Sequence, residues 1–130
     1  MAKSVSLDGD SGPYLQYTYA RCKSIIRNAK ADIIYQRDYE NISKDERTIL
    51  QLLSQFPEVV QEADEKYAPN IVCNYVFQIA QAYNHFYNTH PVLKAEEEET
   101  RQFRLLLTVA TAHVIQNSLY LLGIAAPEKM

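Results

Sequence analysis

Residues 69–90, PNIVCNYVFQIAQAYNHFYNTH, carry a long helical pattern. Apolar and aromatic residues recur here every three or four positions: Val72, Tyr75, Val76, Ile79, Ala82, Tyr83 and Phe86. This spacing lines one face of an α-helix. Pro69 suits the first turn because its missing N–H would have no partner there, and Pro91 disfavours helix beyond His90. The stretch therefore predicts one long helix with a buried face.

A second long helix is predicted on the N-terminal side, over residues 13–31. Its apolar stripe follows the same spacing and consists of Leu15, Tyr19, Cys22, Ile26 and Ala29. Gly12-Pro13 precedes it and suits a helix start. Residues 1–12 are polar and contain Asp8-Gly9-Asp10, a composition typical of a loop.

Three further helices are predicted from start and stop signals. Ser43 and Glu46 form a capping box, in which each side chain accepts a hydrogen bond from an unpaired backbone N–H. Pro57 ends that helix and starts a short one with Val59, Val60, Ala63 and Tyr67 on its apolar face. The last helix begins near Ala95, and Gly123 terminates it. Its expected buried face consists of Phe103, Leu106, Leu107, Ala110, Val114 and Leu121. The sum is an all-α fold: an N-terminal loop over residues 1–12, then one domain over 13–130, a helical bundle of about five helices with short loops.

Composition narrows the possible functions. The chain has 130 residues and a formal charge of −3, which by itself argues against nucleic-acid binding. Its two cysteines, Cys22 and Cys73, lie in helical patterns and are expected to be buried, reduced thiols. No apolar run approaches the ~20 residues that span a bilayer, so we expect a cytoplasmic protein without a membrane partner. The sequence offers no catalytic constellation and no metal-ligand spacing, and neither is predicted.

The local charge of the helix over residues 13–31 differs from that of the whole chain. From Tyr14 to Arg37 there are five basic residues and one acidic residue, which gives a local charge of +4. The face opposite the apolar stripe contains Tyr14, Tyr17, Thr18, Arg21, Ser24, Ile25 and Asn28, with Lys23 and Arg27 beside it. Aromatic rings stack on unpaired bases and cations bind phosphates, so this pattern favours single-stranded RNA. The alternative is that the tyrosines cover the core and that the basic side chains are exposed to solvent without a ligand.

Three segments resemble the DALR-type anticodon-binding domain of arginyl-tRNA synthetases. They are residues 6–21 (SLDGDSGPYLQYTYAR), residues 73–87 (CNYVFQIAQAYNHFY) and residues 121–130 (LLGIAAPEKM). They occur in the family's order and span nearly the whole chain. A cysteinyl-type synthetase has a related helical domain, but its ending resembles residues 127–130 less well.

The resemblance implies an RNA-recognition module whose partner is the anticodon stem-loop of tRNA(Arg). The family charges its tRNA with arginine and ATP in a separate catalytic domain, and neither signature of that domain is complete here. It therefore implies no cofactor for this chain, ATP being used by the catalytic domain. That domain is the other implied partner, in a protein expected to be monomeric.

The resemblance also implies RNA-binding residues. From the first helix these are Tyr14, Tyr17, Thr18 and Arg21; from the aromatic helix, Tyr83 and Tyr87; and from the terminus, Met130. Tyr83 could equally belong to the core, because it also completes the apolar stripe. Lys23 and Arg27 are candidate phosphate contacts on charge alone. An alternative function is a protein–protein interaction or assembly domain, in which the same tyrosine surface meets a protein.

Overall fold

The computed structural model describes residues 11–29, 42–95 and 97–127, and these form five helices and no strand. In chain order they are α1 (Ser11–Ala29), α2 (Lys44–Ser54), α3 (Phe56–Glu65), α4 (Pro69–Thr89) and α5 (Glu98–Leu121). The predicted all-α fold is confirmed. The last two residues of the predicted N-terminal loop belong to α1, and its other ten lie outside the described residues.

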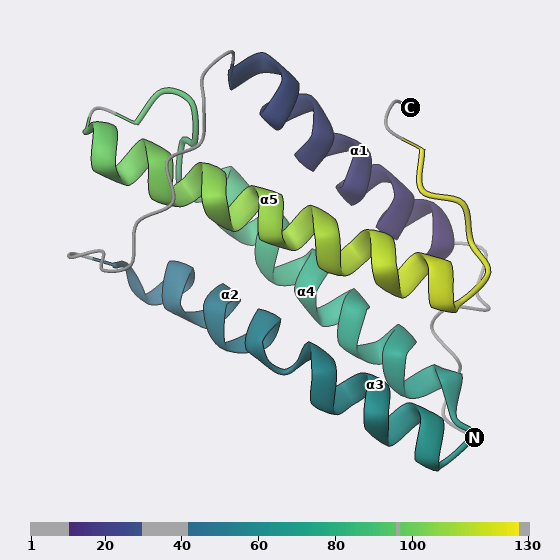
Figure 1. Ribbon diagram of the computed structural model, residues 1–130. Coiled ribbons are helices and arrows are strands. Elements are labelled where there is room, and N and C mark those ends of the chain that lie inside the picture. The colour runs from purple at the N-terminus through teal and green to yellow at the C-terminus, as the bar shows by residue number, and fades with distance from the viewer. Residues whose placement is uncertain (1–10, 30–41, 96, 128–130) are drawn as a thin grey trace.

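The helices α4 and α5 form the centre of the bundle (Figure 1). α1 packs against α5 and α4 on one side, and α2 packs against the same pair on the other. α3 continues from α2 and packs on α4. The core lies where these helices meet, and its largest fully buried side chains include Leu15, Tyr19, Ile49, Tyr83, Phe86, Ile115 and Leu119.

The predicted helix signals are present in the structure. The Ser43 hydroxyl accepts from the Glu46 N–H, and the Glu46 carboxylate accepts from the Ser43 N–H. Gly123 follows α5 with a φ of 75°, and the Ile124 N–H donates back to the Leu119 carbonyl at 2.8 Å. This is the left-handed helix terminus that glycine favours. Both cysteines are buried, and neither forms a disulfide.

The expected faces of two helices need correction. On α5, Leu121 is 51% exposed, whereas Leu105, Thr108, Ala112 and Ile115 are buried although they lie outside the predicted stripe. The reason is that α5 packs against α1, α2 and α4 at once, so it has no single buried face.

Tyr67 does not belong to the apolar face of the short helix. It is 92% exposed and follows α3 with a φ of 50°, the left-handed conformation more usual for glycine. The next N–H, of Ala68, donates to the Ala63 carbonyl at 2.9 Å, so Tyr67 occupies the terminating position of α3.

Candidate nucleic-acid interface

Arg21 is the centre of a polar and aromatic cluster where α1 meets the second half of α4. Its Nη1 donates to Asn84 Oδ1 at 2.8 Å, and its Nη2 donates to the Tyr17 hydroxyl at 2.9 Å. The first bond joins the two helices, and the second joins successive turns of α1. The guanidinium is therefore held from two directions.

Two tyrosine rings flank this guanidinium. Arg21 Cζ lies 4.9 Å from the centroid of the Tyr17 ring and 4.3 Å from that of the Tyr87 ring. Both distances are within the range of a cation–π interaction. Tyr17 is 50% exposed and Tyr87 39%, so solvent reaches both rings. We call these three residues, Tyr17, Arg21 and Tyr87, the Arg21 surface.

A hydrogen-bond network supports the Arg21 surface from beneath. Asn84 Nδ2 donates to the Tyr14 hydroxyl and to Thr18 Oγ1, each at 2.9 Å. The Thr18 hydroxyl in turn donates to the Tyr14 carbonyl at 2.9 Å. The half-buried Tyr14 ring also packs on Phe77, with centroids 5.2 Å apart. Tyr14 therefore reaches the surface from a position fixed by α4.

Two of the predicted RNA contacts are buried instead. Thr18 and Tyr83 are each 0% exposed, and the Tyr83 hydroxyl lies 2.7 Å from Thr108 Oγ1. Burial raises the pKa of Tyr83, as expected for a phenol removed from water. Neither side chain is accessible to RNA in this structure. Thr18 instead binds Asn84 beneath the Arg21 surface, and Tyr83 is part of the core. Ile25 was predicted on the same exposed face and is also buried.

The two basic residues chosen on charge alone do not join the Arg21 surface. Lys23 lines a hollow of about 200 Å³ between α1 and α5, with Tyr19, Val109 and His113 among its other lining residues. Arg27 is exposed in the last turn of α1, where the helix dipole favours a cation. Neither position contradicts a phosphate contact, but neither adds to the cluster around Arg21.

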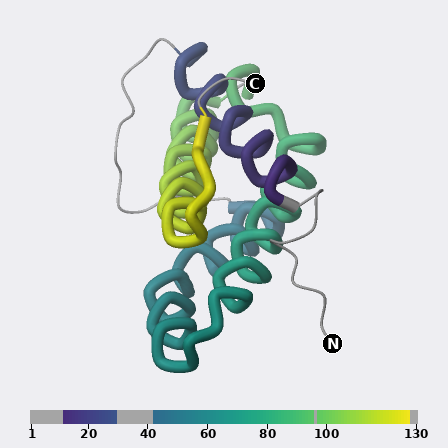
Figure 2. Tube along the Cα trace, turned by 90° about the vertical axis from the view of Figure 1, so that its right-hand side faces the viewer, coloured from purple at the N-terminus to yellow at the C-terminus, as the bar shows by residue number. Residues whose placement is uncertain are grey.

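The predicted contact Met130 lies outside the described residues. The segment before it does approach α1, because Gln16 Nε2 donates to the Ala125 carbonyl at 2.9 Å. Figure 2 shows this segment, in yellow, running beside α1. The described part of the C-terminal tail and the start of α1 are thus neighbours.

Sequence reasoning missed Asn84, the residue that joins Tyr14, Thr18 and Arg21. Its partners precede it by 63 to 70 positions, so no local spacing reveals the contact. The available signal was indirect: Asn84 follows Tyr83 and precedes Tyr87 by three positions, which places it on the same side of α4 as Tyr87.

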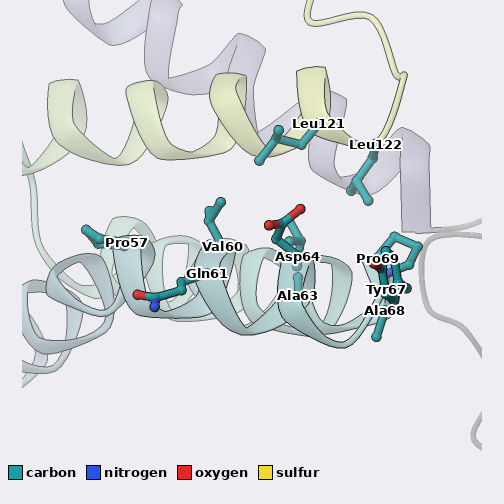
Figure 3. A pocket seen from close by; sticks show the side chains of 11 residues that line it. Pro57, Val60, Gln61, Ala63, Asp64, Tyr67, Ala68, Pro69, Leu121 and Leu122 are labelled. Atoms are coloured by element: carbon teal, nitrogen blue, oxygen red, sulfur yellow. The ribbon is translucent and has the colours of Figure 1, made fainter.

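A second surface feature is an apolar cleft of about 650 Å³ between α3, the start of α4 and the end of α5. In Figure 3, Val60 and Asp64 of α3 lie opposite Leu121 and Leu122. The Asp64 carboxylate would repel phosphate rather than attract it. The cleft shares no lining residue with the Arg21 surface.

The described residues contain no group of three or more His, Cys, Asp or Glu side chains placed to hold a metal ion. Within the same part of the chain, no helix has the length and apolar character needed to cross a membrane.

Comparison with known proteins gives the family. Residues 15–130 match the family model of the DALR anticodon binding domain. The chain is 42% identical to an arginine–tRNA ligase of Pyrococcus furiosus over 134 residues and to one of Clostridium botulinum over 127 residues. Each match covers 97% of this chain but only 21% and 22% of the relatives, so the chain spans about a fifth of their length.

A solved structure agrees. The arginyl-tRNA synthetase of Thermus thermophilus matches 96% of this chain with a TM-score of 0.85 and 36% sequence identity, over 22% of its own length. The resemblance read from the three sequence segments is therefore confirmed, and the chain belongs to the DALR anticodon-binding domain family.

Proposed function

We propose that this chain recognises the anticodon loop of tRNA(Arg), as a module of an arginine–tRNA ligase. Membership of the DALR family and the names of the relatives support the RNA partner. The observation that carries the proposal to particular residues is the Arg21 guanidinium, held beside two exposed tyrosine rings.

The chemistry of this surface suits unpaired bases. A base stacked on an aromatic side chain contributes about 1–3 kcal/mol, and the bases of a hairpin loop, unlike those of a stem, are free to stack. Arg21 uses two of its five N–H donors within the protein, which leaves others for phosphate oxygens or base edges. Such contacts neutralise phosphate charge, so binding should weaken as salt rises.

The proposed role is recognition rather than catalysis. We assign the activation of arginine with ATP, and the transfer of arginine to tRNA, to the part of the ligase that this chain does not match. Within the intact enzyme, anticodon binding here would help to place the tRNA so that its acceptor end reaches the active site.

The proposal is tested by titrating the chain with an arginine-type anticodon stem-loop and with one whose anticodon is changed, at low and moderate salt. Tyr17→Ala and Tyr87→Ala should each weaken binding by about 1–3 kcal/mol, which is roughly 5- to 150-fold. Tyr120→Ala is the matched control, since Tyr120 is 82% exposed on α5. Equal affinities for all four proteins would contradict the assigned surface, and indifference to the anticodon would contradict recognition.

A second candidate function, contact with a protein, is favoured by the cleft rather than by the tyrosine surface. Leu121 and Tyr67 line the cleft and are exposed, and large exposed apolar side chains beside a groove are typical of protein-binding sites. Sedimentation velocity at several concentrations tests for self-association. A salt-insensitive dimer that Leu121→Asp abolishes, together with no RNA binding, would favour this second function; a monomer throughout would contradict self-association.

A further inference from the structure

Asn84 uses its whole amide in contacts between helices. Its oxygen accepts from Arg21, and its nitrogen donates to the Tyr14 hydroxyl and to Thr18 Oγ1. The side chain is half-buried, and all three partners belong to α1. A single amide on α4 therefore contacts three successive side chains along one face of α1.

The orientation of this amide follows from the hydrogen-bond chemistry of its partners. The Thr18 hydroxyl has one hydrogen, which it donates to the Tyr14 carbonyl at 2.9 Å. Its oxygen can then only accept, so the Asn84 group that faces it must be the donating NH₂. The Asn84 oxygen is consequently on the side of Arg21, where a guanidinium can only donate.

This arrangement decides where the guanidinium lies. An arginine side chain has large rotamer entropy, and a surface arginine normally samples many positions. Here the bond to Asn84 fixes Nη1 and the bond to Tyr17 fixes Nη2, while the Tyr17 and Tyr87 rings flank the group. Ordering a side chain before a ligand arrives lowers the entropy lost on binding.

We infer that Asn84 is a positioning residue of the Arg21 surface: its amide, oriented by Thr18, holds the Arg21 guanidinium beside the Tyr17 and Tyr87 rings. Its effect on RNA affinity rests on the proposed function and acts through Arg21. The groups bound would be RNA hydrogen-bond acceptors, namely phosphate oxygens or base edges beside a stacked base.

The first test is a double-mutant cycle on binding of the arginine-type anticodon stem-loop. Asn84→Leu keeps the branching and the number of side-chain heavy atoms but removes all three hydrogen bonds, and it should weaken binding about tenfold. In an Arg21→Ala background the same substitution should change affinity less than about twofold, since its route is already removed. Asn74→Leu is the matched control, an exposed asparagine earlier on α4. An equal loss in both backgrounds would overturn the inference.

The second test needs no RNA. Ring currents shift the NMR signals of nuclei near aromatic faces, so the Arg21 side-chain signals should be shifted in the parent chain. The shift should be lost in Asn84→Leu and kept in Asn84→Asp, which retains an acceptor for Nη1. Signals that stay shifted in Asn84→Leu would overturn the inference. If Asn84→Leu fails to fold, Asn84→Ala replaces it, because it also removes the acceptor for Nη1: a lost shift supports the inference and a kept shift overturns it.

The two tests separate the two proposals. A parent chain that binds no stem-loop, but whose Arg21 shift disappears in Asn84→Leu, refutes the proposed function and supports the positioning role. A parent chain that binds and needs Tyr17 and Tyr87, but tolerates Asn84→Leu without loss, supports the proposed function and refutes the positioning role.

Discussion

The substitution Tyr83→Phe separates a core tyrosine from an RNA-binding one. Tyr83 is fully buried, and its hydroxyl lies 2.7 Å from Thr108 Oγ1. The Thr108 hydroxyl donates its own hydrogen to the Arg104 carbonyl at 2.9 Å, so Tyr83 must be the donor. Phenylalanine keeps the ring in place and leaves the Thr108 oxygen without this donor.

The size of the effect follows mainly from the lost bond to Thr108, although the Tyr83 hydroxyl also interacts with the Cys22 side chain. A neutral intramolecular hydrogen bond contributes about 0.5–1.5 kcal/mol net, and leaving a buried acceptor unsatisfied places the cost toward the upper end. We expect the free energy of unfolding to fall by about 1–1.5 kcal/mol. For a chain of this size each kcal/mol corresponds to roughly 4 °C in the melting temperature. Tyr83→Ala, which also removes the ring, should cost about 3–5 kcal/mol.

Urea unfolding followed by circular dichroism measures the stability of Tyr83→Phe, and titration with the anticodon stem-loop measures its RNA affinity. Stability should fall while affinity stays within about twofold of the parent. Tyr120→Phe is the control, because that hydroxyl is on an 82% exposed side chain and its loss should change neither quantity. A loss of affinity at unchanged stability would refute the placement of Tyr83 in the core.

Further predictions concern stability. Burial raises the pKa of Cys22 from its ordinary value of about 9 to about 12, so the unfolded thiol ionises first and stability falls as pH rises from 9 to 12. Cys22→Ala should remove up to about 1.4 kcal/mol per pH unit from that slope in urea unfolding. Arg104→Met leaves the 3% exposed Glu46 without the cation 2.8 Å away and should cost about 3 kcal/mol; adding Glu46→Gln should recover part of the loss. Gly123→Ala should cost about 1 kcal/mol because φ is 75°, whereas Tyr67→Gly should gain about 0.5–1 kcal/mol.

Each of these has a result that contradicts it. An unchanged alkaline slope in Cys22→Ala would mean that the thiol ionises alike in both states. A fully additive cost in the Arg104 and Glu46 double variant would deny their coupling. Equal signs for Gly123→Ala and Tyr67→Gly in thermal melts would deny that the left-handed backbone sets their effects.

Local sequence patterns were sufficient for much of the fold. The stripe of α4 is correct at every predicted position except the half-buried Ala82, and the capping box and Gly123 act through neighbouring backbone groups. The prediction for α5 is wrong because its buried residues cover a wider part of the helix surface than one apolar stripe, and periodicity in one segment finds only one face. Threonine and serine at buried positions also gave no apolar signal there.

The candidate site was predictable in its exposed part only. Tyr17, Arg21 and Tyr87 were identified from the family resemblance. Independently, the aromatic and basic residues interleaved along α1 had indicated an RNA-binding helix. Thr18 lies on the same side of α1 as Tyr17 and Arg21 but faces α4, a contact that the sequence does not reveal. The role of Asn84 depends on a register between two helices more than 60 residues apart in the chain.

RNA binding at the Arg21 surface is the step on which the proposed function depends. The most direct test is NMR mapping of backbone and side-chain signals during titration with the arginine-type anticodon stem-loop. The largest changes should fall on Tyr17, Arg21, Asn84 and Tyr87, and the signals of Tyr120 and of the α3–α5 cleft should not change. Changes concentrated at the cleft, or spread evenly over exposed lysines and arginines, would contradict binding at the Arg21 surface.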